Sequence, residues 1–186
     1  MGLLKFDINK KAFSREGLLE ELRFISVYYM FQSDNGLIWI GTHGMGLLLY
    51  DIHNKILIYK YTLKENSVWC ICCDKNDDIW FGTTNNGIYK INRSEDSLIN
   101  YNENHGLPNN SAYGLLFDNE DNIWISTGNG ISKFIPDIQK FINYEFEDGL
   151  QGNDFNSYSY LKTENDYLHF GGMNGITYFN PSEIKD

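Results

Sequence analysis

The stretch Leu37–Asp51, LIWIGTHGMGLLLYD, decides the fold because similar phrases recur three more times along the chain. The other copies are DIWFGTTNNGIYKIN at 78–92, NIWISTGNGISKFIP at 122–136 and YLHFGGMNGITYFNP at 167–181. Spacings of 41, 43 and 45 residues separate the glycines that close the copies, which are Gly46, Gly87, Gly130 and Gly175. A period in the low forties built from short strands is typical of a four-stranded propeller blade, whereas helical repeats of similar length need long amphipathic runs.

Each copy lies within a larger unit that contains four short runs of strand-forming residues. In the unit that begins at Ser111, these runs are 112–117, 123–127, 131–135 and 140–144. They are rich in β-branched and aromatic residues and are bounded by the Gly, Asn and Asp residues that hairpins use. Neighbouring apolar residues point to opposite faces of such a strand, so each sheet must be covered on both sides. The sequence therefore predicts an all-β fold, a β-propeller with blades of four antiparallel strands.

The repeats divide the chain into about four blades of a single β-propeller over residues 1–186. The predicted boundaries are partial blades at 2–23 and 155–181 and whole blades at 24–62, 67–102 and 111–146. Because the chain begins in the middle of a repeat, we expect it to be a piece of a longer protein. Exposed strand edges favour pairing, so the partial blades predict self-association, head to tail between two chains. Closure within one chain is the alternative, and a dimer could also result from truncation.

Charge and apolar patterning exclude several classes of partner. A net charge of −10 and a pI near 4.8 argue against nucleic acid and against direct contact with an anionic membrane, because both need a basic face. No apolar stretch approaches the length of about 18 residues that a membrane span needs, and the N-terminus does not resemble a signal peptide. Cys70, Cys72 and Cys73 lie in one predicted strand, so we expect buried thiols rather than a disulfide framework or a zinc site.

The repeat resembles the two-component regulator propeller repeat, and the resemblance covers nearly the whole chain. It rests on the motifs Gly106-Leu107-Pro108-Asn109, Asp118 with Ile123-Trp124, and Asp34-Asn35-Gly36 with Ile38-Trp39-Ile40-Gly41-Thr42. The segments 148–155 and 170–181 resemble the final repeat of such propellers. The resemblance implies the C-terminal four repeats of a bacterial sensor domain that is periplasmic or extracellular and belongs to a membrane-anchored hybrid two-component system or a related regulator. It also implies an oligosaccharide ligand and no cofactor.

Loops at one end of the blades recur in register but differ in side chain, which makes them candidates for a ligand site. Amide and hydroxyl groups suit sugar hydroxyls, and nearby aromatic rings offer stacking surfaces. The candidates are His43, Trp69, Asn85, Asn86, Tyr113, Asn129, Met173 and Asn174. The alternative is that Asn and Gly lie there because hairpin turns need a positive φ, and that Trp69 belongs to the core. His43 is required by no turn geometry.

Metal binding and catalysis are not expected. Acidic turns such as 74–78 lack the alternating spacing of a calcium loop, and the histidines show no paired metal-binding motif. Sialidase-type propellers need three converging arginines, whereas Arg15, Arg23 and Arg93 come from inequivalent repeat positions. The leading hypothesis is a non-catalytic ligand sensor in signal transduction. A protein–protein interaction scaffold is the alternative, and a carbohydrate-active enzyme or lyase comes third.

Overall fold

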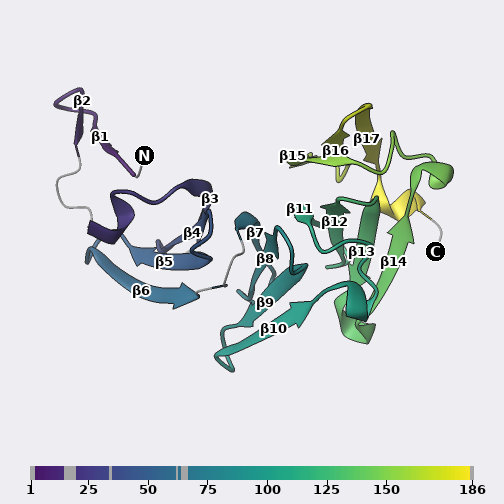
Figure 1. Ribbon diagram of the computed structural model, residues 1–186, viewed down its shortest axis with the longest axis horizontal. Coiled ribbons are helices and arrows are strands. Elements are labelled where there is room, and N and C mark those ends of the chain that lie inside the picture. The colour runs from purple at the N-terminus through teal and green to yellow at the C-terminus, as the bar shows by residue number, and fades with distance from the viewer. Residues whose placement is uncertain (1–2, 15–19, 34, 62, 64–66, 185–186) are drawn as a thin grey trace. The chain divides into compact units, whose positions relative to one another are not determined.

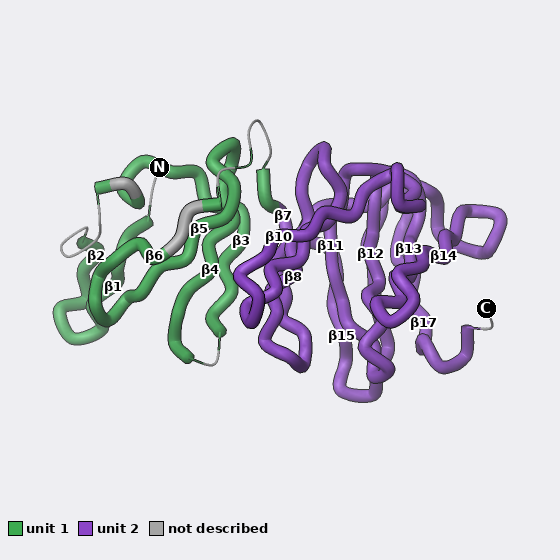
Figure 2. Tube along the Cα trace, turned by 90° about the horizontal axis from the view of Figure 1, so that it is seen from below, with its two compact units in different colours: residues 1–68 green, residues 69–186 purple. Residues whose placement is uncertain are grey.

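The computed structural model describes residues 3–14, 20–33, 35–61, 63 and 67–184, and its regular structure is antiparallel β-sheet with short 3-10 turns (Figure 1). Among these residues there are three sheets of four strands, one of three and one of two. The two smaller sheets are at the two ends of the chain, so the predicted blades and partial terminal blades are confirmed. No helix in the described part of the chain is long and apolar enough to cross a membrane. Two compact units, Met1–Val68 and Trp69–Asp186, are described in turn (Figure 2).

The first unit consists of a hairpin and one blade. Strands β1 (Lys5–Asp7) and β2 (Ala12–Ser14) form the hairpin, and the short helix η1 (Glu20–Leu22) follows. The blade has the order β3 (Val27–Gln32), β4 (Ile38–Thr42), β5 (Leu47–Asp51) and β6 (Ile56–Tyr61). A buried cluster covers one face of this blade and contains Leu22, Ile25, Ile40, Leu48 and Tyr50.

The second unit contains two four-stranded blades and a three-stranded sheet. The first blade is β7 (Val68–Cys73), β8 (Ile79–Thr83), β9 (Ile88–Asn92) and β10 (Ser97–Tyr101), with helix η2 (Glu103–His105) after it. The second is β11 (Ala112–Phe117), β12 (Ile123–Thr127), β13 (Ile131–Ile135) and β14 (Lys140–Tyr144), with η3 (Pro136–Ile138) before β14 and η4 (Phe146–Asp148) after it. The last sheet is β15 (Phe155–Lys162), β16 (Leu168–Gly172) and β17 (Gly175–Phe179), followed by η5 (Pro181–Glu183).

In the two whole blades of the second unit, a carboxylate six residues before the repeat tryptophan fixes that tryptophan in the core. The indole of Trp124 donates to Asp118 Oδ2 at 2.9 Å, and that of Trp80 donates to Asp74 Oδ2 at 3.0 Å. The other oxygen of each carboxylate accepts backbone N–H groups of its own turn. The acidic turns therefore brace the backbone and anchor the indole. The repeat tryptophans belong to the core, because Trp39, Trp80 and Trp124 are at most 2% exposed.

In each four-stranded blade, a threonine and a glycine lock the hairpin between the second and third strands. In the first blade of the second unit, Thr83 Oγ1 donates to the carbonyl oxygen of Gly87 at 2.8 Å, and equivalent bonds join Thr42 to Gly46 and Thr127 to Gly130. Gly87 has a φ of 72°, and a Cβ atom there would collide with the carbonyl oxygen of Tyr101. Glycine is thus required twice, by its backbone angle and by the approach of the fourth strand.

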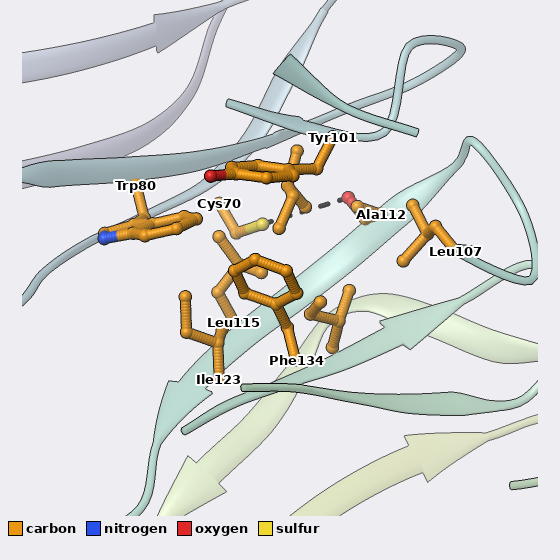
Figure 3. Packing of buried hydrophobic residues seen from close by; sticks show 10 residues of the cluster. Cys70, Trp80, Tyr101, Leu107, Ala112, Leu115, Ile123 and Phe134 are labelled. Atoms are coloured by element: carbon orange, nitrogen blue, oxygen red, sulfur yellow. Dashed lines mark hydrogen bonds between the residues drawn. The ribbon is translucent and has the colours of Figure 1, made fainter. Parts of the chain in front are cut away.

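Neighbouring blades of the second unit bury a shared aromatic and aliphatic layer (Figure 3). Trp80 and Tyr101 lie on the facing side of one blade, and Phe134 of the next blade packs against both rings. At Gly82, an added Cβ atom would lie 2.8 Å from the carbonyl oxygen of Ala112, so the glycine admits the inner strand of the next blade. A small residue after the tryptophan pair is therefore needed for this close approach.

The connections between these blades are themselves ordered by asparagine. The Asn110 side chain accepts from the amide of Glu103 at 3.0 Å, and the Glu103 carboxylate accepts from the amide of Asn110. The Asn110 carbonyl accepts from the amide of Gly87 at 2.7 Å, which ties the connection to the hairpin turn. Asn153 makes the matching bonds to Phe146 and Gly130.

Candidate ligand site

The predicted site residues lie at the blade end where the hairpins close. In an antiparallel blade, the hairpin between the second and third strands shares an end with the connection to the next blade, so turn residues and the start of each inner strand come together there. In the second unit this end includes Asn85 and Asn86, Asn129, and Met173 with Asn174. The inner strands contribute Trp69 and Tyr113.

Trp69 and Tyr113 are the two predicted site residues that the structure brings into direct contact. Their rings stack with centroids 4.9 Å apart and planes 18° apart. Tyr113 lies at an irregularity between Ala112 and Gly114, where the pairing of β11 with β12 shifts by one residue. A bulge of this kind re-aims a side chain that the regular alternation would direct elsewhere. Both residues are half-buried, so part of the stacked pair remains exposed to solvent.

Polar groups flank this aromatic pair. A Cβ atom built on Gly128 would lie 2.8 Å from Asn109 Oδ1 and 3.4 Å from the Tyr113 hydroxyl, so both groups converge on this turn. Ser111 Oγ donates to the carbonyl oxygen of Thr84 at 2.6 Å, which holds the Asn85 turn beside the start of β11. Sequence reasoning missed Asn109, although its place in the Gly-Leu-Pro-Asn motif of the connection was a usable signal.

Two of the predicted polar residues are exposed but have side chains that contact other side chains of the protein. Asn86 Nδ2 donates to the Tyr89 hydroxyl at 3.0 Å, which directs the amide toward the outer strands. His43 Nδ1 lies 3.0 Å from both the Tyr28 hydroxyl and Ser67 Oγ. His43 is nevertheless exposed, and its imidazole connects the inner strand of its blade to the residue before β7.

The other predicted residues differ in exposure and have backbone amides that are held in place. Met173 is 72% exposed, and its amide donates to the carbonyl oxygen of Asp154 at 3.2 Å. The amide of Asn174 donates to Gln151 Oε1 at 2.7 Å. Asn129 is half-buried and its amide donates to Thr127 Oγ1, while Asn85 is exposed. The turns are therefore rigid at the backbone, and the Asn85, Met173 and Asn174 side chains face solvent.

A separate polar cavity lies at the opposite end of the two whole blades of the second unit. Its volume is about 240 Å³, and its lining includes Asp74, Lys75, Lys90, Asp121 and Asp137. Lys90 Nζ lies 2.8 Å from Asp78 and 3.7 Å from Asp74, and Lys75 pairs with Asp121. Burial alone would lower the pKa of Lys90, but the neighbouring carboxylates outweigh this and raise it. Both lysines of the cavity are therefore engaged by carboxylates of the protein.

The cysteine strand holds no reactive thiol pair. None of Cys70, Cys72 and Cys73 forms a disulfide, and Cys70 is fully buried with its thiol directed at the carbonyl oxygen of Ala112. Burial raises the pKa of Cys70 to about 12. Burial also raises the pKa of Cys72 well above its usual value, assisted by the neighbouring thiols and Asp74. In the described part of the chain, no group of three or more His, Cys, Asp or Glu side chains is placed to hold a metal ion.

Comparison with known proteins agrees with the repeat pattern. The family model described as "Two component regulator propeller" matches residues 21–44, 62–85 and 106–129. Each match runs from a blade connection through the inner strand to the hairpin turn, and so includes the connecting leucine and the repeat tryptophan. The chain carries two-component regulator propeller repeats.

Longer proteins contain similar regulator propellers. Histidine kinase P4 of Formosa agariphila is 25% identical over 97% of this chain and 17% of its own length. The extracellular domain of the putative hybrid two component system BT3049 from B. thetaiotaomicron has a TM-score of 0.75 and is 26% identical over 85% of this chain and 22% of that chain. The chain thus spans about a fifth of the length of these relatives. It is of the kind found in extracellular domains of two-component systems.

The fold is also shared with an enzyme. Virginiamycin B lyase from Staphylococcus aureus has a TM-score of 0.62 and is 20% identical over 86% of this chain and 57% of that chain. At this identity the likeness concerns the propeller fold alone. It assigns no catalytic residue to the regulator propeller, because propeller folds carry unrelated functions.

Proposed function

We propose that this chain is a non-catalytic, ligand-sensing β-propeller of a membrane-associated signal-transduction regulator, located outside the cytoplasm, and that its ligand is an oligosaccharide. The similarity to the extracellular domain of a hybrid two-component system carries the sensing part of this proposal. Binding of ligand would bias the output of the larger protein only if the ligand binds one of its states more tightly.

The stacked pair of Trp69 and Tyr113 supports an oligosaccharide as the ligand. Two stacked, half-buried rings offer the apolar surface that sugar rings stack on. Amides at the same blade end, from Asn109, Asn129 and Asn85, supply donors and acceptors for hydroxyl groups. The proposed site is centred on Trp69 and Tyr113 and extends over the turns that carry Asn129, Met173 and Asn174.

A thermal-shift and calorimetry screen of the 186-residue chain against neutral and acidic oligosaccharides tests this proposal. We expect at least one hit whose affinity falls about tenfold or more in Trp69→Ala, because stacking on an indole contributes on the order of 1–3 kcal/mol. Asn86→Ala is the matched control, because its amide is already bonded to Tyr89 and its loss should change affinity less than threefold.

Three results would count against the proposal. A hit whose affinity is equally insensitive to Trp69→Ala and to Asn86→Ala would place the ligand elsewhere. Chemical turnover of a hit, followed by mass spectrometry, would replace sensing with catalysis. Binding of a protein partner with no oligosaccharide hit would favour a scaffold.

A further inference from the structure

The blade from β11 to β14 shows how a fourth strand is held in this repeat. Phe141 of β14 packs with its ring centroid 4.5 Å from that of Phe134. Two residues on, Asn143 donates to the carbonyl oxygen of Gly106 at 2.9 Å and accepts from Ser132 Oγ at 2.6 Å. Residues two apart in a strand face the same side. The fourth strand is therefore fixed by one aromatic side chain and one amide.

The last sheet has an aromatic and a hydroxyl side chain at the positions that hold the fourth strand in the preceding blade. The register of β16 with β17 makes Phe179 and Thr177 the counterparts of Phe134 and Ser132. Between this sheet and the preceding blade is a cavity of about 140 Å³, a size that accommodates a six-membered aromatic ring. Its lining includes Trp124, Tyr144, Gly149, Leu150, Thr177 and Phe179. Among the described residues, β17 pairs only with β16, so the edge beside this cavity has no fourth strand.

Strand β2 has the aromatic residue of the absent strand. Phe13 pairs with Phe6 across the hairpin as Phe141 pairs with Phe134 within its blade, so Phe13 occupies the position of the fourth-strand aromatic. Its side chain is 70% exposed. The partner strand β1 is the counterpart of β17, with Phe6 in the place of Phe179. Because isolated two-stranded hairpins are marginally stable, β2 can exchange β1 for a larger sheet.

We propose that strand β2 of a second copy of this chain leaves its own β1 and pairs with β17, where it becomes the fourth strand of the last sheet and places Phe13 in the cavity. If β2 pairs with β17 as β14 pairs with β13, Phe13 lies opposite Phe179 and Ser14 lies opposite Tyr178. This is a strand exchange between copies, and two such contacts close a head-to-tail dimer. The inference concerns assembly and does not depend on the proposed ligand.

The last sheet has an exposed apolar face of the kind that a neighbouring blade covers elsewhere in the chain. Ile176 is 67% exposed, although Leu47, Ile88 and Ile131 at the same register position are all 0% exposed. In the copy that donates β2, a whole blade follows that strand in sequence. That blade would lie over the face that carries Ile176, as the next blade does for Trp80 in Figure 3. One exchange thus covers both the cavity and the apolar face.

A second copy is favoured over closure within one chain. A second copy can supply a strand to this edge whatever the rotation from one repeat to the next, whereas closure within one chain requires the two ends of that chain to meet.

Sedimentation velocity over a concentration series is the first test. We expect the wild-type chain to reach twice its 21.6 kDa mass. Phe13→Ser should raise the dimer dissociation constant about 30-fold, as expected for loss of a buried aromatic anchor. Ile138→Ser, at a residue that is 64% exposed and outside the proposed contact, is the control and should leave the dissociation constant unchanged. A wild-type chain that stays monomeric up to 100 µM would overturn the proposal.

Disulfide trapping distinguishes exchange between copies from pairing within one chain. A mixture of Ser14→Cys and Tyr178→Cys chains with different tags should form a covalent heterodimer on mild oxidation, whereas neither variant alone should. Lys5→Cys combined with Ser14→Cys locks β2 to β1, because these residues pair in the hairpin, and should give a monomer when oxidised and a dimer when reduced. The proposal fails if Ser14→Cys with Tyr178→Cys on one chain closes an intramolecular disulfide while the mixture stays unlinked.

Discussion

In each acidic turn before a repeat tryptophan of the second unit, one carboxylate both braces the turn and orients the indole. Asp118 is 6% exposed and accepts from two backbone amides as well as from the indole of Trp124. The tryptophan is therefore oriented by the turn that precedes its strand. In the last sheet, Thr163 and His169 occupy these two positions, and the Thr163 hydroxyl donates to the carbonyl oxygen of Tyr167 at 3.2 Å. In the blade of the first unit, Ser33 precedes Trp39 by six residues, so there the indole is kept without the carboxylate.

Replacing this carboxylate should be costly for stability. Asp118→Ala leaves a buried indole N–H and two turn amides without their acceptor, so we expect the free energy of unfolding to fall by about 2–4 kcal/mol. Urea denaturation followed by tryptophan fluorescence measures this change. Glu120→Ala, at an exposed side chain in the same turn, is the control and should stay within about 0.5 kcal/mol of wild type. Equal effects of the two changes would contradict the proposed anchoring.

The buried thiol of Cys70 makes stability fall at alkaline pH. In the folded protein its pKa is raised to about 12 by burial, against a usual value of 9.0. Between these values the unfolded chain loses a proton that the folded chain keeps, so stability decreases as pH rises. The expected slope is about 1.4 kcal/mol per pH unit for this thiol.

Unfolding titrations at pH 8.5 to 10.5 measure that slope. Cys70→Ala should show a shallower decline than wild type over this window, whatever its own stability at pH 7. Part of the decline should remain in the variant, because the pKa of Cys72 is also raised by burial. Identical slopes for the two proteins would show that Cys70 is accessible to solvent.

The hairpin between the second and third strands of a blade needs glycine for two separate reasons, its positive φ and its lack of a side chain. Gly87 and Gly44 have similar positive φ values of 72° and 74°. A Cβ atom on Gly87 would meet the carbonyl oxygen of Tyr101, whereas a Cβ atom on Gly44 would meet nothing within 4 Å. The two positions therefore separate backbone strain from steric collision.

Alanine at these two glycines should have unequal effects. Gly44→Ala carries only the left-handed backbone penalty, about 1–2 kcal/mol. Gly87→Ala also forces the fourth strand away from its hairpin and should cost on the order of 3 kcal/mol or more. Thermal denaturation followed by circular dichroism compares them directly. A smaller loss in Gly87→Ala than in Gly44→Ala would contradict the packing argument.

Strand positions were predictable because their signals are local. The runs 112–117, 123–127, 131–135 and 140–144 coincide with β11 to β14, since Gly, Asn and Asp mark every turn between them. The stack of Trp69 on Tyr113 was not predictable. It joins residues 44 apart through a bulge that regular strand alternation does not reveal. The position of Asn109 was not predictable for the same reason, because its side chain lies beside Gly128, which comes from another part of the blade.

Assembly of the whole chain should make its thermal stability depend on concentration. If β2 exchanges between copies, dimerisation stabilises the folded state, and a ligand or partner present at 100 times its dissociation constant contributes about 2.7 kcal/mol. For a chain of this length that corresponds to a rise in Tm of roughly 5–10 °C. We therefore expect Tm from differential scanning calorimetry to rise by several degrees between 1 and 100 µM protein. Phe13→Ser should have the same Tm at both concentrations, whereas Ile138→Ser should keep the wild-type rise. A Tm for the wild-type chain that does not change with concentration would mean that the last sheet remains three-stranded in solution.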